Sequence, residues 1–201
     1  MRIVNCEQGT DEWFAARLGC PSGSGFSKLI TATGKPSTSA DSYINQLIAE
    51  RLMNRTTETY SNEWMERGKE LEPEARAYYE LYTDNHVREV GFCKHDFYEC
   101  GVSPDGLVGV DGGLEIKCPS PAVHVKYLRY DRIPSEYKAQ VMGCLWITGR
   151  EWWDFVSFHP AMPVLITRVY RDDPYIELLA SEVEKACAVI AKQVSKLGKL
   201  K

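Results

Sequence analysis

The sequence lacks any apolar stretch approaching the roughly 20 residues that a membrane-spanning helix requires, so no segment is predicted to cross a bilayer. Residues 1–7 contain no basic segment followed by an apolar block, and no secretory signal is expected. Repeats of fixed period and low-complexity tracts are also missing, which argues against solenoid and disordered classes. We therefore predict a cytoplasmic protein with a single domain over residues 1–201.

Cysteine is present, but its pattern excludes two common uses of this residue. The seven cysteines are odd in number and scattered, with no Cys-x-x-Cys pair and no histidine at metal spacing. A disulfide framework and a zinc or iron–sulfur site are therefore not expected. The formal net charge is only −4, and a locally basic channel can coexist with such a total. Nucleic acid thus remains a possible partner.

The remaining composition is that of an ordinary globular chain. Of its 201 residues, 44% are hydrophobic and 26% are charged, which allows a sizeable buried core. Apolar spacing and capping signals predict helices over 11–18, from 21–24 through Ile30, over 43–53, 63–82 and 136–147, and from about 174 onward. Pro73 either kinks the fourth segment or begins a new helix. Alternating segments predict strands over 87–93, 97–102, 107–110, 114–118, 152–158 and 164–170. This order indicates an α/β or α+β sheet with helices packed on it.

The chemistry is concentrated in a predicted hairpin. Asp111, Gly112 and Gly113 predict a tight turn before the strand 114–118. Because residues two apart on a strand share a face, Glu115 and Lys117 project together while their neighbours face the core. Asp105, on the partner strand, can lie beside them.

Two converging carboxylates repel each other unless a hard cation lies between them. Oxygen ligands suit Mg²⁺ or Mn²⁺, and such an ion can activate water against a phosphodiester. Lys117 adds a movable positive charge at the same place. The pattern therefore favours metal-assisted phosphodiester hydrolysis.

An Asp followed by Glu-x-Lys is common enough to arise by chance. Asp131 with Glu136 and Lys138 also fits, but there the residues fall at a helix start, where positions two apart do not share a face. For the first match, the alternative is a surface hairpin with ordinary alternating charges. The Pro-Asp-Gly segment, the turn and the apolar flanks argue against it because they fix the hairpin register.

The sequence also resembles a known family, the phage lambda-type 5′→3′ exonucleases, also called viral alkaline or YqaJ-like exonucleases, of the PD-(D/E)XK nuclease superfamily. The segments that carry the resemblance are Ser-Pro-Asp-Gly-Leu (103–107), Gly-Leu-Glu-Ile-Lys-Cys-Pro (113–119), Tyr-Lys-Ala-Gln-Val (137–141) and Leu-Trp-Ile-Thr (145–148). Further similarity lies at Glu-Gln-Gly (7–9), Trp13, Arg-Leu-Gly (17–19), Gly-Lys (68–69), Glu72 and Ala-Arg (75–76). The resemblance implies a PD-(D/E)XK core: an α/β fold with a central mixed β-sheet flanked by helices.

The resemblance also implies roles for individual residues. It makes Asp105, Glu115 and the main-chain carbonyl of Ile116 metal ligands and Lys117 the catalytic lysine. Glu72 matches an additional acidic residue that holds or orients a second metal; the alternative is a solvated acid on a helix face. Gln140 matches a motif glutamine that orients the attacking water, where the residue pattern alone would make it an exposed helix residue.

A second group of residues points to phosphate binding. Ser22, Gly23 and Ser24 precede a predicted helix whose free N–H groups favour an anion, and Arg17 could add a bidentate contact. The alternative is that Ser22 or Ser24 simply caps the helix. By resemblance, Arg17, Ser24 and Ser103 match the pocket that holds the 5′-phosphate of the digested strand.

Together these features predict a Mg²⁺-dependent exodeoxyribonuclease, with one or two ions per site and Mn²⁺ as a substitute. It would degrade the 5′-ended strand of linear duplex DNA and leave 3′ tails for annealing. The resemblance further implies a homotrimeric ring, a single-strand-annealing recombinase partner, and a phage or prophage origin with activity in the bacterial cytoplasm. The alternatives are an endonuclease of the same superfamily and a metal-free DNA-end-binding module.

Overall fold

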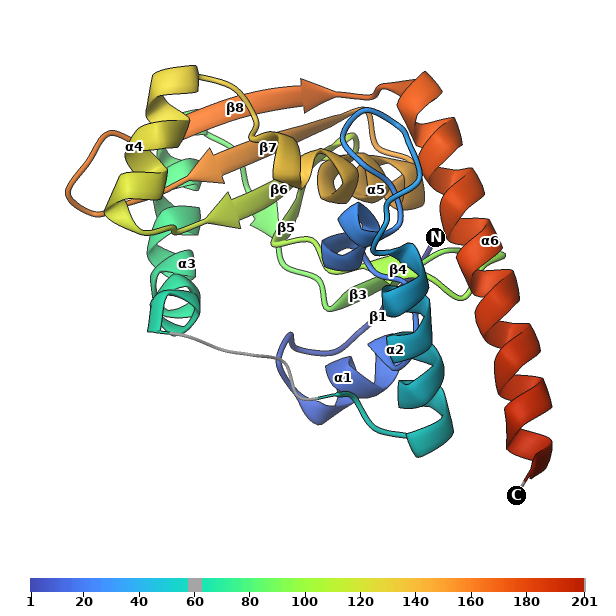
Figure 1. The fold of residues 1–201 in the computed structure, drawn as a ribbon. Helices are drawn as coiled ribbons and strands as arrows, with labels where there is room; N and C mark the ends of the chain where they lie inside the picture. Colours follow the sequence, from blue (N-terminus) through green and yellow to red (C-terminus); the bar gives the residue numbers. More distant parts are fainter. Residues whose placement is uncertain (58–62, 201) are drawn as a thin grey trace.

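The computed structural model describes residues 1–57 and 63–200, which contain two β-sheets and the helices around them (Figure 1). The larger sheet has the strand order β2-β5-β6-β7-β8. Its strands are β2 (Val87–Arg88), β5 (Gly106–Val108), β6 (Gly112–Lys117), β7 (Trp152–Ser157) and β8 (Leu165–Tyr170). Strands β6 and β7 are parallel and every other neighbouring pair is antiparallel. The expected mixed α/β sheet is therefore confirmed.

A smaller antiparallel sheet pairs β1 (Arg2–Val4), β3 (Phe92–Lys94) and β4 (Gly101–Val102), in that order. Residues 103–105 lead directly from β4 into β5, so this short segment joins the two sheets. A bridge between Ser22 and Gly101 attaches the N-terminal region beside the same segment. The two sheets thus meet where Ser103 and Asp105 lie.

Helices cover both faces of the larger sheet. They are α1 (Asp11–Arg17), α2 (Ala40–Met53), α3 (Glu63–Thr83), α4 (Pro121–Tyr130), α5 (Lys138–Thr148) and α6 (Asp173–Leu197), with 3₁₀ turns η1 (Gly23–Lys28), η2 (Ser135–Tyr137) and η3 (Gly198–Leu200). Figure 1 shows α3 and the long α6 on opposite sides of the molecule. Within the described ranges, no helix combines the length and apolar character that a bilayer crossing would need.

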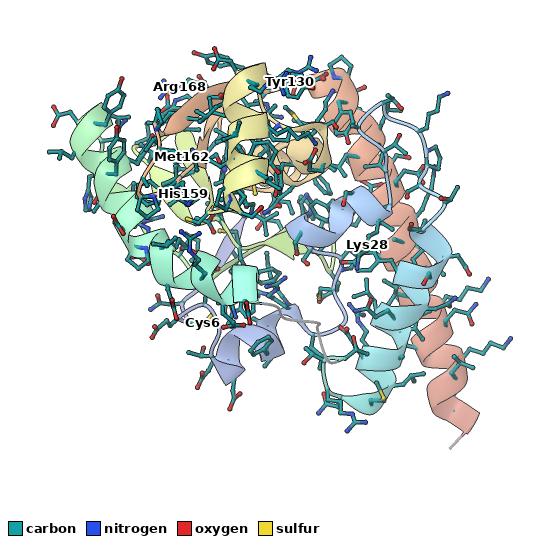
Figure 2. All side chains as sticks on the ribbon, turned by 60° about the vertical axis from the view of Figure 1, so that its left-hand side comes forward. Cys6, Lys28, Tyr130, His159, Met162 and Arg168 are labelled. Atoms are coloured by element: carbon teal, nitrogen blue, oxygen red, sulfur yellow. The ribbon has the colours of Figure 1, made fainter. Side chains whose placement is uncertain are left out.

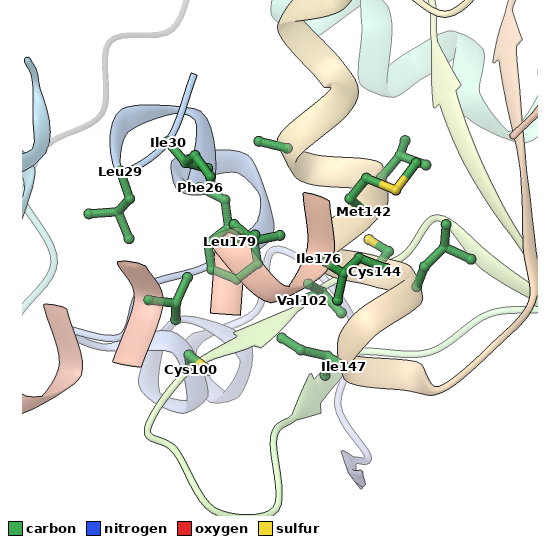
Figure 3. Close-up of a cluster of buried hydrophobic side chains, with 14 of the residues drawn as sticks. Phe26, Leu29, Ile30, Cys100, Val102, Met142, Cys144, Ile147, Ile176 and Leu179 are labelled. Atoms are coloured by element: carbon green, nitrogen blue, oxygen red, sulfur yellow. The ribbon is translucent and has the colours of Figure 1, made fainter. Parts of the chain in front are cut away.

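Two apolar clusters hold these layers together, one on each face of the larger sheet. On one face, Ala75 and Tyr79 of α3 pack against Leu114 and Ile116 of β6. On the other, side chains of η1, β4, α5 and α6 interdigitate, as Figure 3 shows for Phe26, Val102, Met142 and Leu179 among others. Because β6 alternates its side chains between these faces, Glu115 and Lys117 point away from α3.

A buried ionic cluster anchors α3 to the sheet. Asp154 of β7 is 2% exposed and accepts hydrogen bonds from the Tyr79 hydroxyl at 2.7 Å and from two guanidinium nitrogens of Arg168, each at 2.8 Å. Arg168, labelled in Figure 2, belongs to the edge strand β8. Its guanidinium also lies over the Trp152 ring of β7, 3.6 Å from the ring centroid. This anchoring sets the position of Glu72, which lies about two turns earlier on α3.

The structure corrects several sequence expectations. Strand β1 and helix α4 were not predicted, because β1 is too short to show a period and α4 buries only His124 and Tyr127 while Val123 and Val125 are exposed, so its apolar residues form no clear stripe. The helix expected from 21–24 to Ile30 is a 3₁₀ helix of six residues. Of the two alternatives for Pro73, a new helix beginning there is wrong and a single long helix is confirmed, since α3 continues through it.

The tight turn predicted at 111–113 lies earlier, because β6 already begins at Gly112. Gly109, with φ of 53°, takes the left-handed turn position instead. Gly112 and Gly113 are glycine for a different reason: a Cβ at either position would come within 2.2 Å of the Trp152 or Trp153 ring on β7. Close packing between strands, and not the turn, requires these two residues.

The contact between α5 and η1 gives a first prediction. A Cβ at Gly143 would approach the buried Phe26 ring to 2.3 Å, so Gly143→Ala should lower the free energy of unfolding by about 1–3 kcal/mol. Gly198→Ala is the matched control, because that Cβ would have no neighbour within 4 Å. Its unfolding free energy should stay within about 0.5 kcal/mol of the wild-type value in urea titrations. Equal stability of both variants would contradict this packing.

Candidate active site

Asp105 is held directly on strand β6. It precedes β5, whose pairing with β6 places Gly106 opposite Leu114. Its Oδ2 accepts a hydrogen bond of 2.6 Å from the main-chain N–H of Ile116. Asp105 therefore lies beside the two residues that flank Ile116, as the hairpin register predicts.

Glu115 is the most constrained group of the site, with 1% of its surface exposed. Its Oε1 accepts hydrogen bonds from Lys117 Nζ and from Gln140 Nε2 of α5, each at 2.5 Å. Its Oε2 is buried and has no hydrogen-bond partner. A buried carboxylate oxygen without a partner is costly, and its presence requires an explanation such as a bound ion.

The electrostatics of the cluster show how strongly these groups interact. Burial raises the pKa of Glu115 to about 7; the ammonium of Lys117 opposes this shift, and the nearby Asp105 adds to it. Burial likewise raises the pKa of Asp105. For Lys117, burial alone would lower the pKa, but Glu115 and Asp105 outweigh it and raise the pKa. The cluster therefore contains more buried acid than one lysine compensates.

Glu72 approaches the same cluster from α3. Burial, followed by the charge of Asp105, raises the pKa of Glu72 to about 7. Its Oε1 accepts a 2.7 Å hydrogen bond from Arg76, whose other terminal nitrogen lies 2.9 Å from Glu89. Arg76 had been given no role from the sequence, although its i,i+4 spacing from Glu72 is the signal that predicts such an ion pair.

These donors fit a hard divalent cation. In the described part of the chain, no three His, Cys, Asp or Glu side chains are grouped so that they alone could hold a metal ion. Mg²⁺ does not need one, because it is usually bound through one or two carboxylates together with waters and substrate phosphate. Asp105, the free oxygen of Glu115 and the main-chain carbonyl of Ile116 would hold such an ion, and Glu72 is placed to assist.

A cavity of about 1070 Å³ opens beside the acidic cluster. Its lining includes Asp105 and Glu72 as well as Arg17 and Ser24, so the structure brings two of the predicted metal residues and two of the predicted phosphate residues to one space. Cys6 and Lys28, labelled in Figure 2, belong to the same lining. Glu115, Lys117, Gln140 and Ser103 are not among its lining residues.

The predicted phosphate residues are linked by side-chain contacts. The Arg17 guanidinium stacks 3.9 Å from the Trp13 ring centroid and donates to Ser22 Oγ at 3.3 Å. Trp13 in turn donates through Nε1 to Ser103 Oγ at 2.9 Å. Ser24 is exposed on η1. Since η1 is a short 3₁₀ helix, its aligned dipole is small, and the anion argument rests on Arg17 and the hydroxyl groups instead.

Glu50 is a buried acid for which the sequence predicted no role. It is 6% exposed and accepts hydrogen bonds from the Gly19 main chain, Gln46 and Thr57. It thereby ties α2 to the segment that follows α1. The sequence does contain a signal for this burial: Glu50 follows Leu47 by three residues on α2, so both side chains lie on the apolar face of that helix.

This combination of a mixed sheet, flanking helices and a hairpin that presents Asp105 opposite Glu115 and Lys117 defines the class: a fold of the PD-(D/E)XK nuclease type. Within that class, the chain belongs to the YqaJ-like viral recombinase domain family, whose model matches residues 12–151. The resemblance seen in the sequence is thereby confirmed. No curated protein matches the chain significantly.

Solved structures agree with this assignment. An alkaline exonuclease (LHK-Exo) from Laribacter hongkongensis is 36% identical, with a TM-score of 0.87 over 94% of this chain and 97% of that one. LHK-Exo in complex with dAMP gives 37% identity and a TM-score of 0.85 over the same shares. A phage-related exonuclease from Haemophilus somnus 129PT shares the fold at 16% identity, with a TM-score of 0.66 over 89% of this chain and 96% of that one.

The unpartnered oxygen of Glu115 gives a prediction for ion binding. At 100 times its dissociation constant, Mg²⁺ should stabilise the folded protein by about 2.7 kcal/mol and raise the melting temperature by roughly 5–10 °C. Asp105→Asn and Glu115→Gln should lose this rise in thermal-shift measurements, because each removes a charged ligand. Glu74→Gln, an exposed acid on α3, should keep it. An equal rise in all four proteins would exclude the proposed ligands.

Proposed function

We propose that this protein is a metal-dependent nuclease that removes nucleotides from the 5′-ended strand of linear duplex DNA and leaves 3′ single-stranded tails for recombination. Membership of a viral recombinase family and the likeness to an alkaline exonuclease support a nuclease role in recombination. Metal-dependent chemistry is supported by the hydrogen bonding of Glu115. One carboxylate oxygen is fixed by Lys117 and Gln140, and the other is buried without a hydrogen-bond partner.

The metal site consists of Asp105, Glu115 and the Ile116 carbonyl, with Glu72 available for a second ion. Mg²⁺ bound there, or Mn²⁺ in its place, would supply charge stabilisation to the phosphodiester and acidify water. The side chains supply orientation. Asp105 is fixed by the Ile116 N–H, and Arg76 holds the Glu72 carboxylate.

Lys117 contributes a positive charge at the position where negative charge develops on phosphorus. Its raised pKa keeps the amine protonated, and Glu115 holds it in place. The amine also lies 5.3 Å from the Tyr137 ring centroid, a cation–π contact that limits its freedom. Gln140 positions Glu115 through its amide nitrogen. Its predicted role in orienting the attacking water remains part of this proposal.

The preference for a 5′ end is assigned to Arg17, Ser24 and Ser103. Arg17 can bind a terminal phosphate while stacked on Trp13, and Ser24 lies in the same cavity. Ser103 fixes the indole that supports Arg17. A terminal phosphate held there would place the adjoining phosphodiester toward Asp105.

The assembly and partners form part of the same proposal. A homotrimeric ring around DNA would allow a chain of net charge −4 to retain a polyanion within a lined channel. The 3′ tails would then pass to a single-strand-annealing recombinase.

The catalytic assignment is tested with a 5′-phosphorylated linear duplex in Mg²⁺. The wild-type protein should release nucleotides from the 5′ end, and a chelator should stop the reaction. Asp105→Asn should reduce the rate at least about 1000-fold, which corresponds to a loss of several kcal/mol of transition-state stabilisation, while DNA binding remains. Cleavage within closed circles would indicate an endonuclease, and binding without cleavage would indicate an end-binding module.

End recognition gives a separate prediction. Arg17→Ala should lower the cleavage efficiency on 5′-phosphorylated duplexes roughly 10- to 150-fold, as expected for a lost charge-assisted hydrogen bond, with little change on 5′-hydroxyl duplexes. Arg129→Ala, which removes an exposed arginine of α4, is the control and should leave both efficiencies unchanged. If Arg17→Ala affected both kinds of end equally, Arg17 would not be the phosphate ligand.

A further inference from the structure

Phe14 is a large apolar side chain placed at the lining of the active-site cavity. It lies on α1 and is 41% exposed, and it belongs to the same lining as Arg17, Ser24 and Asp105. An exposed aromatic residue on a flat surface needs no explanation, but one in a cavity with convergent polar groups suggests a ligand.

The neighbouring Trp13 differs from Phe14 in how its ring is used. Arg17 covers the Trp13 ring at 3.9 Å from the centroid, and the indole nitrogen is bonded to Ser103. Phe14 meets Trp13 edge-on, with ring centroids 5.0 Å apart and an interplanar angle of 74°. This contact uses only part of the Phe14 side chain, since 41% of Phe14 remains exposed. The Trp13 ring is therefore already occupied by Arg17, whereas Phe14 retains exposed aromatic surface on which a ligand can stack.

Helix geometry places Phe14 beside the predicted phosphate ligand. Phe14 and Arg17 are three residues apart on α1, so their side chains are neighbours on one face, roughly 5–6 Å apart at Cβ. A nucleotide presents a matching pair of features: an anionic phosphate and, one sugar away, a flat aromatic base. Thr10 caps the N-terminus of α1, because its hydroxyl accepts a hydrogen bond from the main-chain N–H of Trp13.

We propose that Phe14 forms a stacking subsite for the unpaired nucleobase at the 5′ end of the digested strand, an inference that rests on the proposed function. Arg17 binds the phosphate and Phe14 binds the base of the same nucleotide. Stacking on an aromatic ring tolerates every base, because each has a π-face. The subsite therefore favours an end whose terminal base has left its complement, without selecting a sequence.

The test compares Phe14→Ala, Phe14→Leu and Phe14→Tyr on two 5′-phosphorylated duplexes. One carries an ordinary terminal nucleotide, and the other carries a tetrahydrofuran residue without a base at that position. On the ordinary duplex, Phe14→Ala and Phe14→Leu should raise KM roughly 5- to 150-fold, the range expected for one base–aromatic stack. Phe14→Tyr should retain the wild-type KM because it keeps the ring.

On the duplex without the terminal base, the wild-type KM should rise by the same factor, and the Ala and Leu variants should show no further loss. Phe97→Ala is the control, since Phe97 is 88% exposed and lies outside the cavity lining. It should leave both values unchanged. An unchanged KM in Phe14→Ala, or an equal loss on both duplexes, would overturn the stacking role. Absence of 5′ digestion by the wild-type protein would instead refute the proposed function.

Discussion

Two carboxylates and one amine meet between neighbouring strands, where Glu115 is buried and Asp105 and Lys117 are half-buried. The rest of the site is arranged around the excess of acid in this cluster. Asp105 is bonded to the backbone of β6, and Glu115 is bonded to Lys117 and Gln140. One carboxylate oxygen of Glu115 is left buried and unpartnered. Burying such a group is unfavourable without a counter-charge, and the proposed divalent cation would supply that charge.

The surrounding elements place this cluster against a cavity. Helix α3 delivers Glu72 and is fixed to the sheet by Tyr79 and Asp154. Helix α5 delivers Gln140 and packs on η1, which presents Ser24. The link between the two sheets carries both Ser103, a predicted phosphate residue, and Asp105, a predicted metal ligand. Helices α3 and α5 thus each pack against the core and also position one polar side chain of the site.

Local patterns predicted the long elements well. The strands around Glu115 and the segments 152–158 and 164–170 match β6, β7 and β8 within one or two residues, because their alternation is strong. Weak local signals failed: β1 has three residues, and η1 was expected as a longer helix. The glycines at 112 and 113 were misread as a turn, since their function depends on Trp152 and Trp153, which are distant in sequence.

The sequence by itself determined that a hairpin forms here, the shared face of Glu115 and Lys117, and the family, because these follow from alternation over a few residues and from contiguous motifs. The turn of that hairpin lies earlier than the sequence predicted. Only the tertiary structure decided which distant groups reach that face. Gln140 on Glu115, Glu72 near Asp105, Trp13 on Ser103 and the exposed ring of Phe14 all depend on how helices pack across the sheets. Such contacts join residues far apart along the chain, and local periodicity carries no information about them.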